Sequence, residues 1–318
     1  MGITRREFLA GALAFGAVQL IPSKVEAQFN PTDHVFVVGD LHLTRNDPAK
    51  KSDALISSLV SISNRSAGFH VIFNGDMLEF PNLAEMCDSG AWQWDQFAAL
   101  YARLKTAGFI PHLVFGNHDG SEDFARRMLD GLVPPEHIGN SSFHLENGIR
   151  FILLSAMHPT DLDARFLHKE LRKNAGNPAI VACHFPPDAL TYIPGRAGRH
   201  YDFWSKAEIL HALSDSHLPL VCSHSHAPFL GNYVSYALGG PIHFVSTPSL
   251  TYTLPYVGTD ILPPRIFGIT VLDSRNFLNG TEFFNADKSF MPPKETVESR
   301  KGRYRPLAPS PALRIFQR

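Results

Sequence analysis

The segment HVFVVGDLH, residues 34–42, joins an apolar run to a pair of polar side chains. We predict that residues 34–39 form a buried strand, because the run is short, apolar and rich in β-branched residues. The same design recurs at 69–74, which precedes Gly75-Asp76, and at 110–115, which precedes Gly116-Asn117-His118-Asp119. Ligands of α/β proteins bind at the carboxyl ends of strands. The sequence therefore predicts a site at one edge of a sheet.

Helical patterns separate these runs, and in the pattern at 92–106 the apolar residues fall on one face. Alternating strands and helices predict parallel pairing through crossover helices. Two stacked sheets with helices outside would accommodate the number of strands, and we expect one catalytic domain over residues 28–285. The remaining predicted elements are helices at 52–63, 123–130, 163–173 and 203–214, and strands at 151–156, 179–183, 218–222, 242–246, 265–272 and 280–284.

Two further motifs follow predicted strands: His184, and the triplet His224-Ser225-His226. The i, i+2 spacing of Asp40 and His42, and of the two histidines of the triplet, places each pair on one face of an extended segment. The donors combine imidazole, carboxylate and amide oxygen, which suits Mn, Fe or Zn rather than Ca or a cysteine-rich zinc site. Seven donors fit two divalent transition metals that share a carboxylate. The candidate ligands are Asp40, His42, Asp76, Asn117, His184, His224 and His226.

In order and residue type, the five motifs resemble those of the calcineurin-like metallophosphoesterases over roughly residues 34 to 250. The resemblance implies an α/β fold, a four-layer α/β/β/α sandwich of two stacked mixed sheets flanked by helices. It also implies hydrolysis of phosphate esters by a hydroxide that bridges two metal ions, with phosphodiesters slightly favoured. The first ion would be held by Asp40, His42 and His226, the second by Asn117, His184 and His224, and Asp76 would bridge them.

The same resemblance assigns catalytic roles to two residues that would bind no metal. His118 would act as the general acid, and Asp119 would orient His118 and stabilise its charged form. The chain departs from the family at Ser223, where glycine is usual, and we expect this change to be tolerated with some adjustment of the loop. Glu79 stands where purple acid phosphatases carry a metal-binding tyrosine, and it either contacts a ligating histidine or faces solvent.

Other residues leave two interpretations open. Arg196 and Arg199 either present cations to a phosphate or lie in an ordinary surface loop. Trp92, Trp94 and Phe80 either stack on a base or pack in the core. Cys183 and Cys222 are expected to be small core residues, which approach each other if their strands are neighbours.

The competing functional hypotheses use the same site differently. A phosphomonoesterase or a nuclease would keep the whole constellation, whereas a non-catalytic metal-binding interaction module or a mononuclear metalloprotein would not need it. The expected partner is a small phosphoester substrate. A formal net charge of −1 indicates no general attraction to nucleic acid or to anionic lipid, and the sequence favours no oligomeric state.

The two ends of the chain differ from its body. Residues 1–27 are typical of a twin-arginine signal peptide, with Arg5-Arg6 before an apolar stretch and Val25-Glu26-Ala27 at a cleavage-type site. We therefore expect an exported protein, periplasmic or extracellular, with no transmembrane span in the mature chain, since no apolar run reaches about 18 residues. Residues 286–318 are basic and proline-rich, which predicts a solvated tail on the surface.

Overall fold

A computed structural model of the protein describes residues 29–43, 48–64, 66–79, 88–155, 161–174, 176–187, 207–224, 229–234, 238–247, 268–277, 280–285, 297–298 and 303–306. The helices are α2 (Pro48–Ile62), α4 (Asp88–Thr106), α5 (Glu122–Met128), α6 (Asp161–Asn174) and α7 (Ala207–Asp215), with a short 3₁₀ helix at Pro135–His137. The strands are β1 (His34–Val38), β2 (His70–Asn74), β3 (Ile110–Val114), β4 (Ser141–His144), β5 (Arg150–Leu154), β6 (Ala179–Cys183), β7 (Leu220–Cys222), β8 (Phe229–Val234), β9 (Ile242–Ser246), β10 (Gly268–Asp273), β11 (Glu282–Asn285), β12 (Val297–Glu298) and β13 (Arg303–Pro306).

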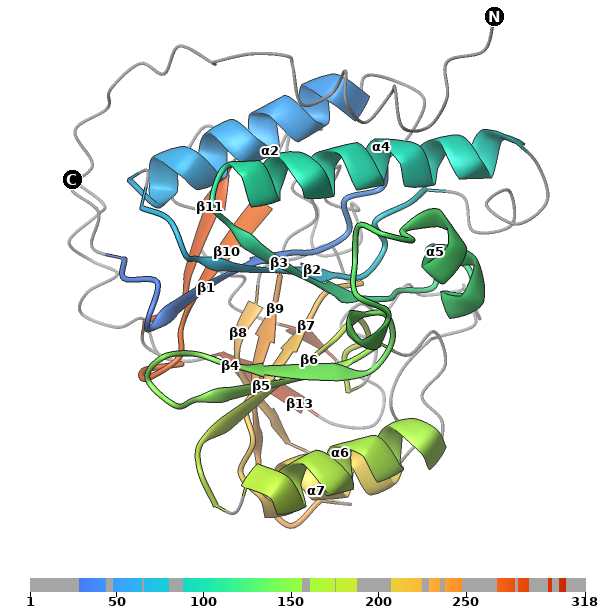
Figure 1. The fold of residues 1–318 in the computed structure, drawn as a ribbon. Helices are drawn as coiled ribbons and strands as arrows, with labels where there is room; N and C mark the ends of the chain where they lie inside the picture. Colours follow the sequence, from blue (N-terminus) through green and yellow to red (C-terminus); the bar gives the residue numbers. More distant parts are fainter. Residues whose placement is uncertain are drawn as a thin grey trace, which may run out of the picture.

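These elements form two stacked mixed sheets with helices on both outer faces (Figure 1). The first sheet has the strand order β11-β10-β1-β2-β3, and the second has the order β12-β13-β8-β9-β7-β6-β5-β4. Helices α2 and α4 cover the first sheet, and α6 and α7 cover the second. The predicted four-layer α/β/β/α sandwich is therefore confirmed.

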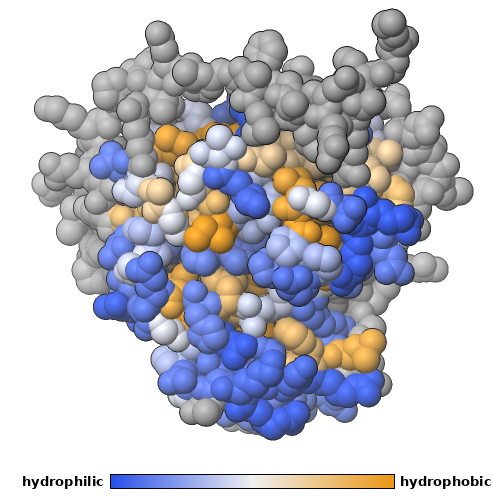
Figure 2. Space-filling model, in the orientation of Figure 1, coloured by the Kyte–Doolittle hydropathy of each residue, from blue (hydrophilic) through white to orange (hydrophobic). Residues whose placement is uncertain are grey.

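Three apolar clusters fill the spaces between the four layers. One packs the first sheet against α2, α4 and α5, another packs the second sheet against α6 and α7, and the third lies between the sheets. β6 is buried at every position because both of its faces are covered. Most of the surface over α6 that faces the viewer in Figure 2 is hydrophilic, and Leu162 is an exposed apolar residue of this helix. Among the described residues, no helix has the length and apolar character needed to cross a bilayer.

The strands that carry the motifs are neighbours. β1, β2 and β3 pair in parallel in the first sheet, and β6 and β7 pair in parallel in the second. This confirms the parallel pairing predicted from the alternation of strands and helices. The same pairing brings Cys183 and Cys222 together, with both thiols free, buried and 3.7 Å apart between their sulfur atoms.

Four strands were not predicted from the sequence. β4 is a polar edge strand and β8 contains an internal glycine, so neither shows the apolar run used to recognise strands. β12 and β13 lie within the segment predicted as a solvated tail. Arg303–Pro306 pairs antiparallel with β8 and so adds to the second sheet. The solvent exposure of this segment stays a prediction. The start of the helix predicted at 203–214 lies outside the described residues, as do residues 265–267 of a predicted strand.

His70 at the start of β2 and His112 in the middle of β3 form a pair in the first sheet that contacts the second sheet through Phe143. His70 Nδ1 and His112 Nε2 are 2.8 Å apart, and both rings stack on Phe143 of β4. Burial lowers the pKa of His70 to about 4. Burial also lowers the pKa of His112, and the neighbouring His70 and His137 add to the effect. Both rings are therefore neutral at pH 7.

We predict that this pair makes the metal-free protein sensitive to acid. The unfolded chain takes up a proton on His70 near pH 6.5, whereas the folded chain does so near pH 4, so stability present above pH 6.5 is lost as the pH falls. Between pH 7.5 and 5.5 the wild type should lose roughly 1 kcal/mol more unfolding free energy than His70→Asn, allowing for partial solvent access. Urea unfolding in the presence of chelator measures the difference.

The matched control is His144→Gln, because His144 is an exposed histidine on β4. This variant should lose as much stability as the wild type over the same pH range. Equal losses in the wild type and His70→Asn would contradict the prediction.

Candidate metal centre

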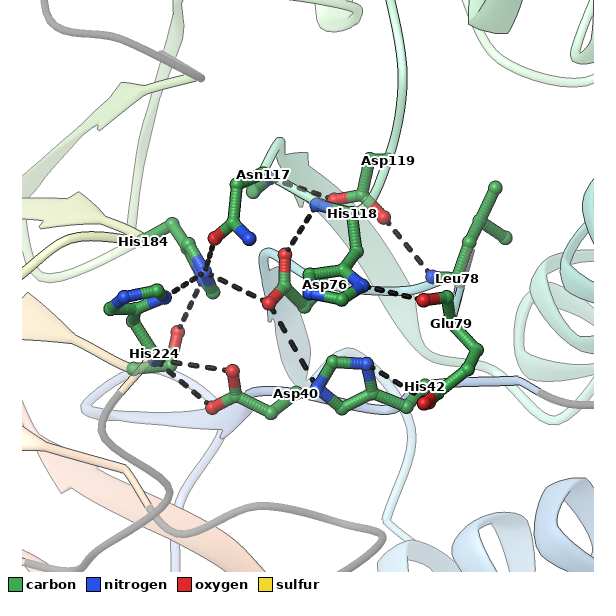
Figure 3. Close-up of polar contacts among 12 residues, drawn as sticks. Asp40, His42, Asp76, Leu78, Glu79, Asn117, His118, Asp119, His184 and His224 are labelled. Atoms are coloured by element: carbon green, nitrogen blue, oxygen red, sulfur yellow. Dashed lines mark hydrogen bonds and ion pairs between the residues drawn. The ribbon is translucent and has the colours of Figure 1, made fainter. Parts of the chain in front are cut away.

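The motif residues of the described chain converge at the carboxyl ends of five strands (Figure 3). The two sheets contribute from opposite sides, so residues far apart in sequence face one another. His226 lies outside the described residues, and its role as a ligand stays a prediction. The residues brought together are Asp40 and His42 after β1, Asp76 after β2, Asn117 and His118 after β3, His184 after β6 and His224 after β7.

The donors fall into two groups that share one carboxylate. Asp40, His42 and Asp76 form one group, and Asp76, His184 and His224 form the other, with one ligand atom from each residue within 4.8 Å of the others. Asp76 belongs to both groups. The assignment of His226 to the first ion and of Asn117 to the second stays a prediction.

Short contacts connect the second group and its surroundings. The Nε2 atom of His184 lies 3.2 Å from Asp76 Oδ2, 3.2 Å from Asn117 Oδ1 and 3.2 Å from His224 Nδ1. Asp76 Oδ2 also lies 3.9 Å from His42 Nε2. Both carboxylate oxygens of Asp40 accept from the main-chain N–H of His224, at 3.1 and 3.2 Å. This hydrogen bond connects the first motif to the fifth.

The electrostatics of the cluster require positive charge. Asp76 and Asp40 are fully buried, and burial alone would raise the pKa of Asp76, but His184, His42 and His118 together hold this pKa well below its usual range. Burial alone would lower the pKa of His184, but the Asp76 carboxylate outweighs it and raises the pKa to about 9. Either a proton on His184 or a bound cation can meet this requirement.

The donor set fits a transition metal ion. The Nδ1 atom of His184 is 3.0 Å from the carbonyl oxygen of Asn74, so this nitrogen carries a hydrogen. When the ring is neutral, as a metal ligand is, its lone pair therefore lies on Nε2. The Nε2 lone pair, the Asp76 carboxylate and the Asn117 amide oxygen then face one another with no hydrogen of their own between them. Imidazole nitrogens mixed with carboxylate and amide oxygens suit Mn, Fe or Zn.

Two glycines of the motifs make this close approach possible. A Cβ atom on Gly75 would lie 2.2 Å from His184 Nδ1, and a Cβ atom on Gly116 would lie 2.3 Å from Asp76 Oδ1. Neither contact is sterically allowed without displacing a proposed ligand. The sequence marked these glycines as part of the motifs, but only the packing gives the physical reason for them.

His118 is held at two points, and neither is the one predicted. Its main-chain N–H donates to Asp76 Oδ1 at 2.9 Å, and its Nδ1 lies 2.5 Å from the carbonyl oxygen of Glu79. The carboxylate of Asp119 instead accepts from the main-chain N–H groups of Gly116, at 2.7 Å, and Leu78, at 3.1 Å. The expectation that Asp119 orients the His118 ring is therefore corrected.

Asp119 connects the loops that follow β2 and β3. Its carboxylate is fully buried, and burial followed by the nearby Asp76 charge raises its pKa to about 7. Sequence reasoning missed this role because the two acceptors on Asp119 bond to backbone groups, which leave no signature in residue type.

Glu79 contacts a proposed ligand rather than solvent. Its Oε2 atom lies 3.3 Å from Nδ1 of His42, which directs the other ring nitrogen, Nε2, toward Asp76. Its main-chain N–H donates to Gln93 of α4 at 3.0 Å. Lys51 of α2 donates to the carbonyl of His42 at 3.0 Å; burial lowers the pKa of this lysine, and the Glu79 charge opposes the shift.

The structure describes two of the other residues for which the sequence left two interpretations open. Trp94 is fully buried in the cluster beneath α4, so it packs in the core, and Trp92 is half-buried on the same helix. Phe80, Arg196 and Arg199 lie outside the described residues.

Four of the proposed ligands have backbone angles that L-residues rarely adopt. The φ angles are positive at Asp40 (50°), His42 (44°), Asp76 (52°) and His224 (62°). Such angles cost about 1–2 kcal/mol per residue for a side chain with a Cβ. Strained residues persist when the surrounding structure holds them, and they gather at functional sites.

The fold and the site together define a metallophosphoesterase-type α/β sandwich with a buried His/Asp cluster at its strand ends. A family model described as calcineurin-like phosphoesterase matches residues 34–228. The chain therefore belongs to the calcineurin-like phosphoesterase family. Comparison with curated proteins gives no match.

Several solved structures align with this chain. GAP50, described as the anchor in the inner membrane complex of Plasmodium, aligns with a TM-score of 0.51 at 13% identity, over 89% of this chain and 94% of that chain. A cold-active protein-tyrosine phosphatase of Shewanella aligns with a TM-score of 0.36 at 13% identity, over 87% of each chain. The nuclease MPE of Pseudomonas putida aligns with a TM-score of 0.25 at 14% identity, over 79% of this chain and 83% of that chain. At such identities the likeness to GAP50 is one of fold.

The positive φ angle at His42 yields a direct test of strain in the site. We predict that His42→Gly is more stable than His42→Ala by about 1 kcal/mol in the metal-free protein, because glycine adopts this angle without steric cost. Both variants lose the same imidazole, so the difference between their unfolding free energies measures the cost of the backbone angle. Chemical denaturation in chelator measures it, and an alanine variant at least as stable as the glycine variant would contradict it.

Proposed function

We propose that this protein hydrolyses phosphate esters with two divalent transition metal ions, and that phosphodiesters are favoured over monoesters. The observation that carries the proposal is the pair of donor groups that share the buried carboxylate of Asp76, with His118 held beside it. The slight preference for diesters rests on the order and type of the sequence motifs.

The described residues that would hold the ions are those of the two donor groups together with Asn117, and His226 joins them from the sequence pattern. When bound, two such ions would lower the pKa of water and offset negative charge on the phosphate oxygens. The protein holds the donors in place by burial, by the hydrogen bond from the main-chain N–H of His224 to Asp40, and by the contact of Glu79 with His42.

His118 is placed to move a proton. Because its Nδ1 is committed to the Glu79 carbonyl, Nε2 is the ring atom available to a substrate. The main-chain N–H of His118 donates to Asp76, which anchors the backbone of His118 beside the proposed metal ligands (Figure 3). A proton delivered from Nε2 to the departing oxygen would let an alcohol leave in place of an alkoxide.

The first experiment measures turnover and metal content together. Protein stripped with chelator and reloaded with Mn²⁺ should hydrolyse bis-p-nitrophenyl phosphate faster than p-nitrophenyl phosphate and should bind two ions per chain. His118→Asn should keep both ions and lose roughly 10²- to 10⁴-fold in kcat, the usual contribution of a positioned acid or base.

The matched control is His144→Asn, which should leave activity unchanged. His144 is exposed and pairs with Arg150 at the start of β5, opposite the carboxyl ends that carry the motifs. A monoester preference would replace the diester part of the proposal and keep the rest. One ion per chain would contradict the binuclear part. Full activity in His118→Asn would remove this residue from the mechanism.

We also propose that the protein acts outside the cytoplasmic membrane. The support is the sequence of residues 1–27, with Arg5-Arg6 ahead of an apolar stretch and a cleavage-type site. Replacing both arginines by lysine should leave the full-length protein in the cytoplasm of a bacterial host, whereas the wild-type chain should be recovered, shortened, from the periplasm or the medium. Fractionation and mass spectrometry of the N-terminus decide this, and a variant exported like the wild type would exclude the twin-arginine route.

A further inference from the structure

Ser223 lies where the second sheet meets the proposed metal centre. It follows β7 and precedes His224, and its side chain is fully buried. Its Oγ atom donates a hydrogen bond to the carbonyl oxygen of Asn74, at the end of β2 in the first sheet. The same Oγ lies 3.1 Å from Nδ1 of His184. The hydroxyl therefore contacts both sheets and a proposed ligand.

The carbonyl of Asn74 is the common acceptor of this cluster. His184 Nδ1 lies 3.0 Å from it, and Ser223 donates to it from the neighbouring strand. The side-chain amide of Asn74 donates to the carbonyl of Cys183 at 2.9 Å, which restrains the orientation of the whole residue. One carbonyl with two lone pairs thus receives both a hydroxyl and an imidazole N–H.

This arrangement decides where His184 carries its hydrogen. Because the Ser223 hydroxyl gives its hydrogen to Asn74, it turns a lone pair toward Nδ1 of His184. Among the described residues, that nitrogen faces two oxygen acceptors, the Asn74 carbonyl and the Ser223 hydroxyl, so it must carry N–H. The lone pair of the ring is left on Nε2, the atom that faces Asp76, Asn117 and His224.

The fold makes room for this side chain. A Cβ atom on Gly39 would lie 2.5 Å from Cβ of Ser223 and 3.1 Å from its Oγ, so only glycine fits at the end of β1. The main-chain N–H of Ser223 donates to the carbonyl of His184 at 3.0 Å, which fixes the spacing of the two residues. The position of Ser223 is therefore set by close packing against Gly39 and by a hydrogen bond to His184.

We propose that Ser223 is a positioning residue for His184, which fixes the ring so that Nε2 is presented to a metal ion. A glycine, which the family resemblance gives as the usual residue at this place, could not supply the hydroxyl. The inference rests on the proposed function, in which His184 is a metal ligand. Groups that hydrogen-bond to a ligating histidine typically change metal affinity by 10- to 100-fold.

The test measures Zn²⁺ affinity and the His184 ring in the full-length protein, without turnover. Competition with a chromophoric chelator should show one of two bound ions weakened roughly tenfold or more in both Ser223→Ala and Ser223→Gly. In the zinc-loaded wild type, ¹⁵N-histidine NMR should show a slowly exchanging Nδ1–H on His184. The same proton should shift and exchange faster in Ser223→Ala.

The matched control is Ser214→Ala. Ser214 is also buried, and its Oγ donates to the carbonyl of Gly240 at 2.9 Å and accepts from the N–H of Gly240 at 2.8 Å, away from the strand ends. This variant should fold less stably, because it loses a buried hydroxyl that is hydrogen-bonded. It should nevertheless keep the wild-type zinc affinity and the His184 NMR signal. A metal effect in Ser214→Ala as large as in Ser223→Ala would reduce Ser223 to a structural role.

The two proposals fail in different ways. If the wild type binds no metal ion, the proposed function falls and this inference falls with it. If the wild type binds two ions and both serine variants bind them equally tightly, or if His184 carries its hydrogen on Nε2, only the role of Ser223 is overturned.

Discussion

The buried carboxylate of Asp76 is the interaction on which the rest of the site depends. It lies between His184 of the second sheet and His42 of the first, so one negative charge links the two halves of the sandwich. A buried charge without a partner is costly, and removing one member of such a group leaves the others uncompensated. The cluster therefore keeps its geometry only while positive charge, from a proton or a cation, is present.

The backbone around this carboxylate is as constrained as the side chains. The two motif glycines allow His184 and Asp76 to approach, and four proposed ligands hold positive φ angles. Local sequence preference does not favour these angles, so the packed layers on either side must maintain them. This is the usual relation between a rigid scaffold and a strained functional site.

Much of the fold could be predicted because its central strands are short apolar runs followed by polar motifs. β6 and β9 have the predicted bounds, and the parallel pairing follows from the alternation of strands and helices. The strands that were missed, such as β4 and β13, are polar and are formed by pairing with a neighbour. Polar strands of this kind carry little signal in their own residues, because pairing and not burial defines them.

The sequence by itself determined which residues meet at the strand ends, because motif spacing and strand direction are properties of the chain. Only the tertiary structure decided which groups hold them. Asp119 braces two loops, Glu79 contacts His42 with its carboxylate and His118 with its carbonyl, and Ser223 joins His184 to the opposite sheet. These contacts cross between loops or between sheets, and their partners are often backbone groups that have no residue code. Their geometry arises from packing two sheets together, which no local pattern records.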